Sequence, residues 1–184
     1  VGVFFIAPLF ITRAISTHIE SVIIFNLVEG FIRLGFFVAY LKIIGLSSSM
    51  KRVFAYHGAE HKTINAFEAG VALEVGAVRD YSTAHRRCGT SFLFIVLVIA
   101  IFVFAFIGRP ALWLMVLLRV VLIPVIAGLG YEAVQCSARH ENNAFVRALV
   151  APGLWLQSMS TAEPDDKQLE VAIASLNHAM EADE

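Results

Sequence analysis

Residues 91–107 have the sequence SFLFIVLVIAIFVFAFI, which contains no charged side chain. A helix needs about 20 largely apolar residues to cross the roughly 30 Å hydrocarbon core of a bilayer, and this run approaches that length. The whole chain of 184 residues has a similar character, because 58% of it is hydrophobic and only 16% is charged. Soluble domains usually have about 25% charged residues. We therefore predict that residues 91–107 form a membrane-spanning helix.

The stretches around this helix extend the prediction to a bundle of membrane helices. Residues 111–130 are apolar enough to return across the membrane, with a kink at Pro124. Residues 21–46 are long enough for a tilted span, whereas residues 1–11 are too short to cross and are either the tail of a first span or a re-entrant segment. The sequence thus predicts an all-α fold, a polytopic transmembrane bundle of about three to four membrane helices in one membrane domain. Its membrane segments are residues 1–46 and 91–130, and its cytoplasmic helical segments are residues 47–90 and 131–184.

Three charged residues, Glu29, Arg33 and Arg119, fall inside the predicted membrane helices. Glu29 and Arg33 are four residues apart and can pair on one helix face, which lowers the cost of burying either charge. Arg119 should face protein, water or an acidic partner, for which Glu29 and Glu132 are candidates. Such residues either form structural ion pairs or line a polar pathway, and both interpretations stay open.

Residues 47–90 form the largest polar interval between the predicted spans. This interval has an excess of basic side chains: Lys51, Arg52, Lys62, Arg79, Arg86 and Arg87. Because loops rich in Lys and Arg stay in the cytoplasm, the interval and the C-terminal segment are predicted to be cytoplasmic. In that segment, residues 144–157 favour an interfacial helix ending near Trp155, and residues 165–180 favour a soluble helix. A formal net charge of −1 argues against a nucleic-acid partner, and two cysteines provide no disulfide framework.

The polar interval contains the sequence His57-Gly58-Ala59-Glu60-His61, which has the form H-x-x-E-H. In metalloenzymes with this pattern, the two histidines bind the metal and the glutamate is the candidate general base. A helix is predicted over residues 57–69, and histidines four residues apart share one face of it, so both imidazoles can reach one ion. Glu68 is excluded as a further ligand, because a continuous helix puts it about 10 Å beyond His61. The predicted cofactor is a divalent metal ion of the zinc type.

The remaining ligands come from His85, Cys88 or Glu132. If both His85 and Cys88 join the two histidines, four protein ligands close the site and its role is structural. If Glu132 joins instead, three protein ligands leave a position for water, as in hydrolytic zinc sites. Glu60 would then accept the proton of that water. The basic neighbours could neutralise an oxyanion or bind a phosphate head group: Lys62, Arg86 and Arg87.

A simpler interpretation needs no metal at all. His57 and Glu60 could form a hydrogen bond and cap a helix. Arg86 and Arg87 could bind lipid phosphates, since basic residues beside a span usually determine its orientation.

Several blocks extend in order over most of the chain: NLVEGFIR at residues 26–33, FAYHGAEHKT at 54–63, HRRCGTSF at 85–92, PVIAGLGYE at 124–132 and TAEP at 161–164. Together they resemble the DUF1385 (YqhQ-type) family of bacterial integral membrane proteins. Arg86 departs from the family pattern, which has a proline there, but His85 and Cys88 are in place. The resemblance implies a predicted metal-dependent enzyme of the bacterial inner membrane. Family members also have a further N-terminal cytoplasmic segment, which could hold part of the site.

Our leading hypothesis is a metal-dependent, hydrolytic membrane enzyme that acts on a membrane-proximal peptide or a lipid-derived substrate. A second hypothesis is an oligomeric channel or transporter, in which Glu29, Arg33 and Arg119 line the pathway and the His/Cys cluster is structural. A scaffold without chemistry is the third. The expected partners are membrane lipid and further copies of the chain.

Overall fold

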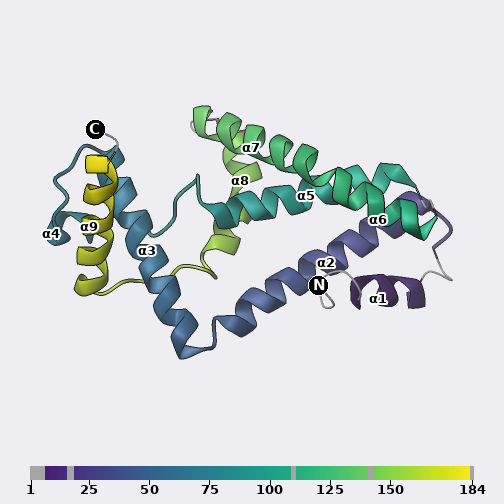
Figure 1. The fold of residues 1–184 in the computed structure, drawn as a ribbon, viewed down its shortest axis with the longest axis horizontal. Helices are drawn as coiled ribbons and strands as arrows, with labels where there is room; N and C mark the ends of the chain where they lie inside the picture. The colour runs from purple at the N-terminus through teal and green to yellow at the C-terminus, as the bar shows by residue number, and fades with distance from the viewer. Residues whose placement is uncertain (1–6, 16–18, 109–110, 141–142, 183–184) are drawn as a thin grey trace. The chain divides into compact units, whose positions relative to one another are not determined.

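The described residues form helices joined by short irregular segments (Figure 1). The computed structural model describes residues 7–15, 19–108, 111–140 and 143–182, and these ranges include no strand, which confirms the all-α prediction. The helices are α1 (Ala7–Ile15), α2 (Val22–Ile44), α3 (Ser48–Glu68), α4 (Val75–Val78), α5 (Gly89–Ile107), α6 (Leu112–Val121), α7 (Ile123–Arg139), α8 (Ala144–Gln157) and α9 (Asp166–Ala182). The chain divides into two compact units, residues 1–40 with 91–147 and residues 41–90 with 148–184.

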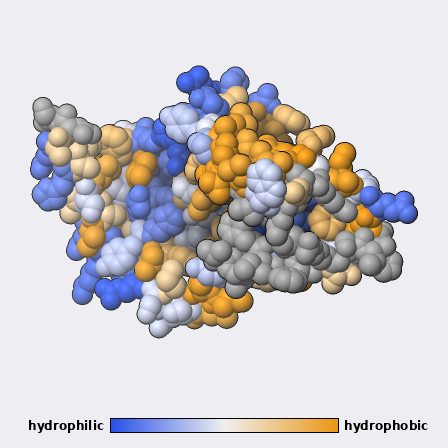
Figure 2. Space-filling model, turned by 45° about the vertical axis from the view of Figure 1, so that its right-hand side comes forward, coloured by the Kyte–Doolittle hydropathy of each residue, from blue (hydrophilic) through white to orange (hydrophobic). Residues whose placement is uncertain are grey.

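The first unit contains the two helices that are long and apolar enough to cross a membrane, α2 and α5. Only 17% of the most apolar stretch of either helix is buried. Large apolar side chains such as Phe31 on α2 and Phe106 on α5 are 62% and 78% exposed. In Figure 2, hydrophobic residues gather over the visible face of this unit, whereas hydrophilic residues are frequent on the second unit. Such outward-facing apolar side chains suit contact with lipid better than contact with water.

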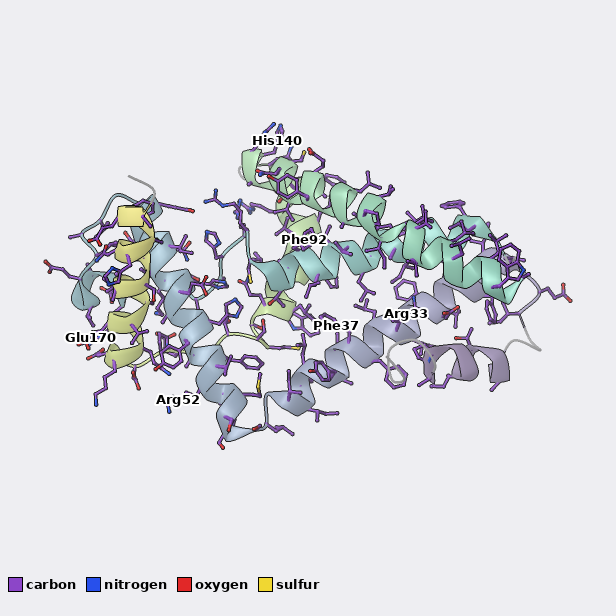
Figure 3. The ribbon with its side chains drawn as sticks, in the orientation of Figure 1. Arg33, Phe37, Arg52, Phe92, His140 and Glu170 are labelled. Carbon is purple, nitrogen blue, oxygen red and sulfur yellow. The ribbon has the colours of Figure 1, made fainter. Side chains whose placement is uncertain are left out.

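Inside the first unit, the predicted ion pair of α2 forms. Arg33 Nη2 donates to Glu29 Oε1 at 2.7 Å, and Glu29 is only 3% exposed. One turn beyond Arg33, Phe37 lies on the same helix, as the labels in Figure 3 show. Both residues line a mainly apolar cavity of about 400 Å³, together with side chains of α5, α6 and α7.

The return segment differs from the single helix predicted over residues 111–130. Helix α6 ends at Val121, and α7 begins at Ile123 with Pro124 in its first turn. A proline has no N–H for the carbonyl four residues earlier and clashes with it, so the predicted kink is a break between two helices. Helix α7 then continues past Gly130 to Arg139. The glycine makes room for α5, since a Cβ there would lie 2.7 Å from Val96 Cγ2. The side chain of Arg119 lies outside the described residues.

The second unit contains α3, α4, α9 and most of α8. Helices α3 and α9 lie side by side (Figure 1) and pack around a small core. The core residues are Ala59, Ala66, Val78, Leu169 and Ile173. The helix predicted over residues 57–69 begins earlier, at Ser48, and ends as expected: Gly70 has a φ of +70° and Val71 N–H donates to the Ala66 carbonyl at 3.1 Å.

Candidate metal centre

Two predicted ligands on α3 and one on the loop before α5 come together in the second unit. The ligand atoms of His57, His61 and Cys88 all lie within 4.8 Å of one another. Cys88 Sγ is 3.2 Å from His57 Nε2, and the two imidazole centroids are 4.3 Å apart. Cys88 directly precedes Gly89, the first residue of α5. Two of the three donors therefore lie on one face of α3, and the third lies directly before the start of α5.

Backbone carbonyls fix the orientation of both imidazoles. His57 Nδ1 donates to the Ser160 carbonyl at 2.8 Å, and His61 Nδ1 donates to the Thr83 carbonyl at 2.6 Å. A carbonyl can only accept, so each Nδ1 carries a proton, and a ring that gives up its Nε2 proton presents the Nε2 lone pair to a metal. Metal-binding histidines typically donate their second ring N–H in this way. The arrangement therefore leaves both Nε2 atoms available to a metal.

Hydrogen bonds favour the thiolate form of Cys88. Burial raises the pKa of Cys88, but hydrogen bonds from His57, His61 and Thr90 outweigh burial and lower this pKa to about 4. The hydrogen bond to Cys88 raises the pKa of His57, against the opposing effect of burial. The thiolate, not the thiol, is the form of cysteine that binds metals.

The segment that follows α8 packs closely against α3, beside His57. Ala162 N–H donates to the Phe54 carbonyl at 2.9 Å, and a Cβ on Gly58 would overlap the Ala162 carbonyl oxygen. Only glycine at position 58 allows this approach. Because Ser160 belongs to the same segment, the approach also positions the carbonyl that holds His57.

Besides the predicted metal ligands, the predicted site residues of this unit are Glu60, Lys62, Arg86 and Arg87. Glu60 lines the same pocket as His57, His61 and Cys88, a cavity of about 330 Å³. Lys62 is buried, pairs with Glu163 at 2.6 Å and donates to the Arg79 carbonyl at 2.7 Å. Arg87 pairs with Glu68. Two of the three predicted anion-binding cations are thus held by carboxylates, and the third, Arg86, is half-buried.

The donor set fits zinc. Two imidazole nitrogens and one thiolate are the ligand types that zinc prefers. Glu132, the other predicted ligand, is an exposed residue of α7 in the first unit, and its part in the site stays a prediction.

Comparison with known proteins agrees with the sequence blocks. A family model described as "Protein of unknown function (DUF1385)" matches residues 1–182. The chain belongs to the DUF1385 family. It is 39% identical over 153 residues to the uncharacterized protein YqhQ of Bacillus subtilis (strain 168), a match that covers 83% of this chain and 48% of YqhQ. The chain thus spans about half the length of this DUF1385 relative. No solved structure matches it.

His85, the fourth donor considered for this DUF1385 chain, has other contacts. Its Nε2 lies 3.5 Å from Glu68 Oε1, and its ring centroid is 5.7 Å from that of His61. The Gln157 side chain accepts from the His85 N–H and donates to the His85 carbonyl, both at 2.8 Å. Burial lowers the pKa of His85, although Glu68 opposes this effect. The imidazole therefore lies beside the three donors, outside their group.

We expect His85→Ala to retain about one zinc ion per chain, with a dissociation constant for zinc raised by no more than about tenfold. This is the smallest effect usually seen when a residue that contacts a metal ligand is removed. Zinc titration of the purified variant would measure this. A loss of bound zinc as complete as for Cys88→Ala would show instead that His85 is the fourth ligand and that the site is closed.

The sequence did not predict that the carbonyls of Thr83 and Ser160 orient the two imidazoles. Nor did it predict the two hydrogen bonds between the Gln157 side chain and the His85 backbone. A backbone carbonyl has no residue-specific signal, and Ser160 is far from His57 along the chain. The nearest clue was the TAEP block at residues 161–164, which directly follows Ser160 and contributed only to the family resemblance.

Proposed function

We propose that this protein is a zinc-dependent hydrolase whose site lies at the surface of the membrane. His57, His61 and Cys88 hold the zinc ion, and Glu60 is the general base. The observation that carries the proposal is the convergence of two anchored imidazoles and a thiolate on one point, in a pocket that Glu60 also lines.

Helices α2 and α5 are the candidates to cross the membrane. If α5 crosses the bilayer, Cys88, the residue before it, lies at the bilayer surface, and so does the pocket that it lines. We propose that α6 and α7 form the return segment of a bundle of about three to four spans. The basic residues of α3, Lys51 and Arg52, support a cytoplasmic position of the site in a bacterial inner membrane.

The chemistry follows from a site with three protein ligands. Such a site keeps one position for water, which distinguishes catalytic from structural zinc. When bound, zinc would lower the pKa of that water and polarise the bond under attack. Glu60 accepts the proton of the attacking water and returns it to the leaving group. The carbonyls of Ser160 and Thr83 keep the two imidazoles in position throughout.

The channel alternative has less support. It needs hydrated charges along a path through the membrane helices. The charges of Glu29 and Arg33 instead neutralise each other at 2.7 Å, and Glu29 is almost completely buried. A paired and buried arrangement favours a structural role for these residues.

We expect Glu60→Gln to retain zinc while its hydrolytic rate falls by about 10²- to 10⁴-fold, the usual contribution of a general base. The assay would compare ester, peptide and phosphodiester substrates with the protein in lipid nanodiscs. Glu170→Gln is a matched control, because Glu170 is exposed on α9 (Figure 3). Unchanged activity in Glu60→Gln would refute its role as the base, and loss of zinc would identify Glu60 as a ligand.

A further inference from the structure

A second cavity of the same unit is not used by the metal centre. It is a groove of about 350 Å³ between α3 and α9, and most of its lining is apolar. Its walls include Tyr56 and Ile64 of α3 and Val171 and Leu176 of α9. The volume lies in the range of pockets that bind small organic ligands.

The groove and the metal pocket share a boundary. Glu60 and Ile64, which are four residues apart on α3, line both cavities. A ligand whose polar group lies at the metal pocket can therefore extend its apolar part past these two side chains into the groove.

Small side chains of α9 leave this space open. Ala172, Ser175 and Ala179 lie along one side of the groove, at spacings that put them on one helix face. Ser175 and Ala179 are exposed, so larger side chains there would fill the groove without disturbing the core of the unit.

We propose that this groove binds the acyl chain of a lipid substrate whose hydrolysable head group lies at the metal centre. The proposal rests on the proposed function and narrows its substrate class. An acyl chain suits an apolar groove that lies between two helices. Cys88 also joins the metal pocket directly to α5, the more apolar of the two candidate membrane helices, which would bring this pocket to the bilayer surface.

The test uses a pair of zinc-binding probes that differ in chain length, acetohydroxamic acid and octanoyl hydroxamic acid. Each methylene buried in the groove strengthens binding by about fourfold. We expect the octanoyl probe, with about three to four of its six additional methylenes in the groove, to bind the zinc-loaded protein in nanodiscs about 100-fold more tightly than acetohydroxamic acid, after correction for empty nanodiscs. In the double variant Ser175→Leu/Ala179→Leu this ratio should fall below about tenfold, with binding of acetohydroxamic acid unchanged. Ala174→Leu, an exposed position outside the groove lining, is the control that should keep the full ratio.

The possible binding results separate a failure of the groove proposal from a failure of the hydrolase proposal. The groove proposal is overturned if acetohydroxamic acid binds and the octanoyl probe binds no more tightly. It is also overturned if the tighter binding of the octanoyl probe survives in the double variant. Either result leaves the hydrolase proposal standing. A leucine hydroxamate that gains as much as the octanoyl probe overturns the assignment to an acyl chain and points to a peptide.

A second measurement does not depend on zinc. An octanoyl probe with a terminal diazirine should, on illumination, label the peptide that contains residues 171–179, and the double variant should lose this labelling. Labelling restricted to other peptides would overturn the groove proposal even if the protein binds no metal.

Discussion

Replacing both His57 and His61 with alanine is expected to reduce bound zinc from about one ion per chain to none. The two imidazoles supply two of the three donors, and a single thiolate at Cys88 cannot hold the ion against water. The measurement is metal analysis after purification without chelators. Added zinc should also raise the unfolding temperature of the native protein and leave that of the double variant unchanged, since only a folded state that binds the ion is stabilised.

The matched control is the double variant His140→Ala/His178→Ala. Both of these histidines are exposed and lie outside the three-donor group. This variant should retain the full amount of zinc. Zinc retained equally by both double variants would place the ion elsewhere in the chain.

The second large effect is expected for Gly58→Ala, which adds a single methyl group. Its Cβ would overlap the carbonyl oxygen of Ala162, and a backbone carbonyl cannot rotate away as the end of a side chain can. The segment must therefore move and weaken the hydrogen bond from His57 to Ser160. We expect zinc affinity to fall by about 10- to 100-fold, as when an outer partner of a metal ligand is lost. The free energy of unfolding should fall by about 1–3 kcal/mol, the usual cost of overpacking.

Gly76→Ala provides the comparison for this variant. Gly76 lies on α4 of the same unit, and a Cβ there would meet nothing within 4 Å. Zinc titration and urea unfolding of both variants would measure the difference. If Gly58→Ala binds zinc as tightly as Gly76→Ala does, the segment after α8 does not position His57.

Local spacing explains which features the sequence predicted well. Glu29 and Arg33 are four residues apart, and so are His57 and His61, so the helix period alone puts each pair on one face. The helix predicted over residues 57–69 ends close to the predicted residue, at Glu68, because Gly70 adopts the left-handed conformation that glycine tolerates.

Contacts between distant residues explain what the sequence left open. The choice of third ligand among Cys88, His85 and Glu132 depends on how the loop before α5 returns to α3, which no local pattern determines. The extent of α7 was misjudged for a related reason. The predicted span ended at Gly130, yet α7 continues to Arg139, and Gly130 allows α5 to approach.

The most direct test of the central claim is X-ray absorption at the zinc edge of the purified, zinc-loaded protein. We predict one sulfur at about 2.3 Å and two imidazole nitrogens at about 2.0–2.1 Å, with a further light atom that is not from imidazole. The sulfur signal should disappear in Cys88→Ala. A spectrum of the native protein without a sulfur neighbour, or with three imidazoles and one sulfur, would contradict an open site of two histidines and one cysteine.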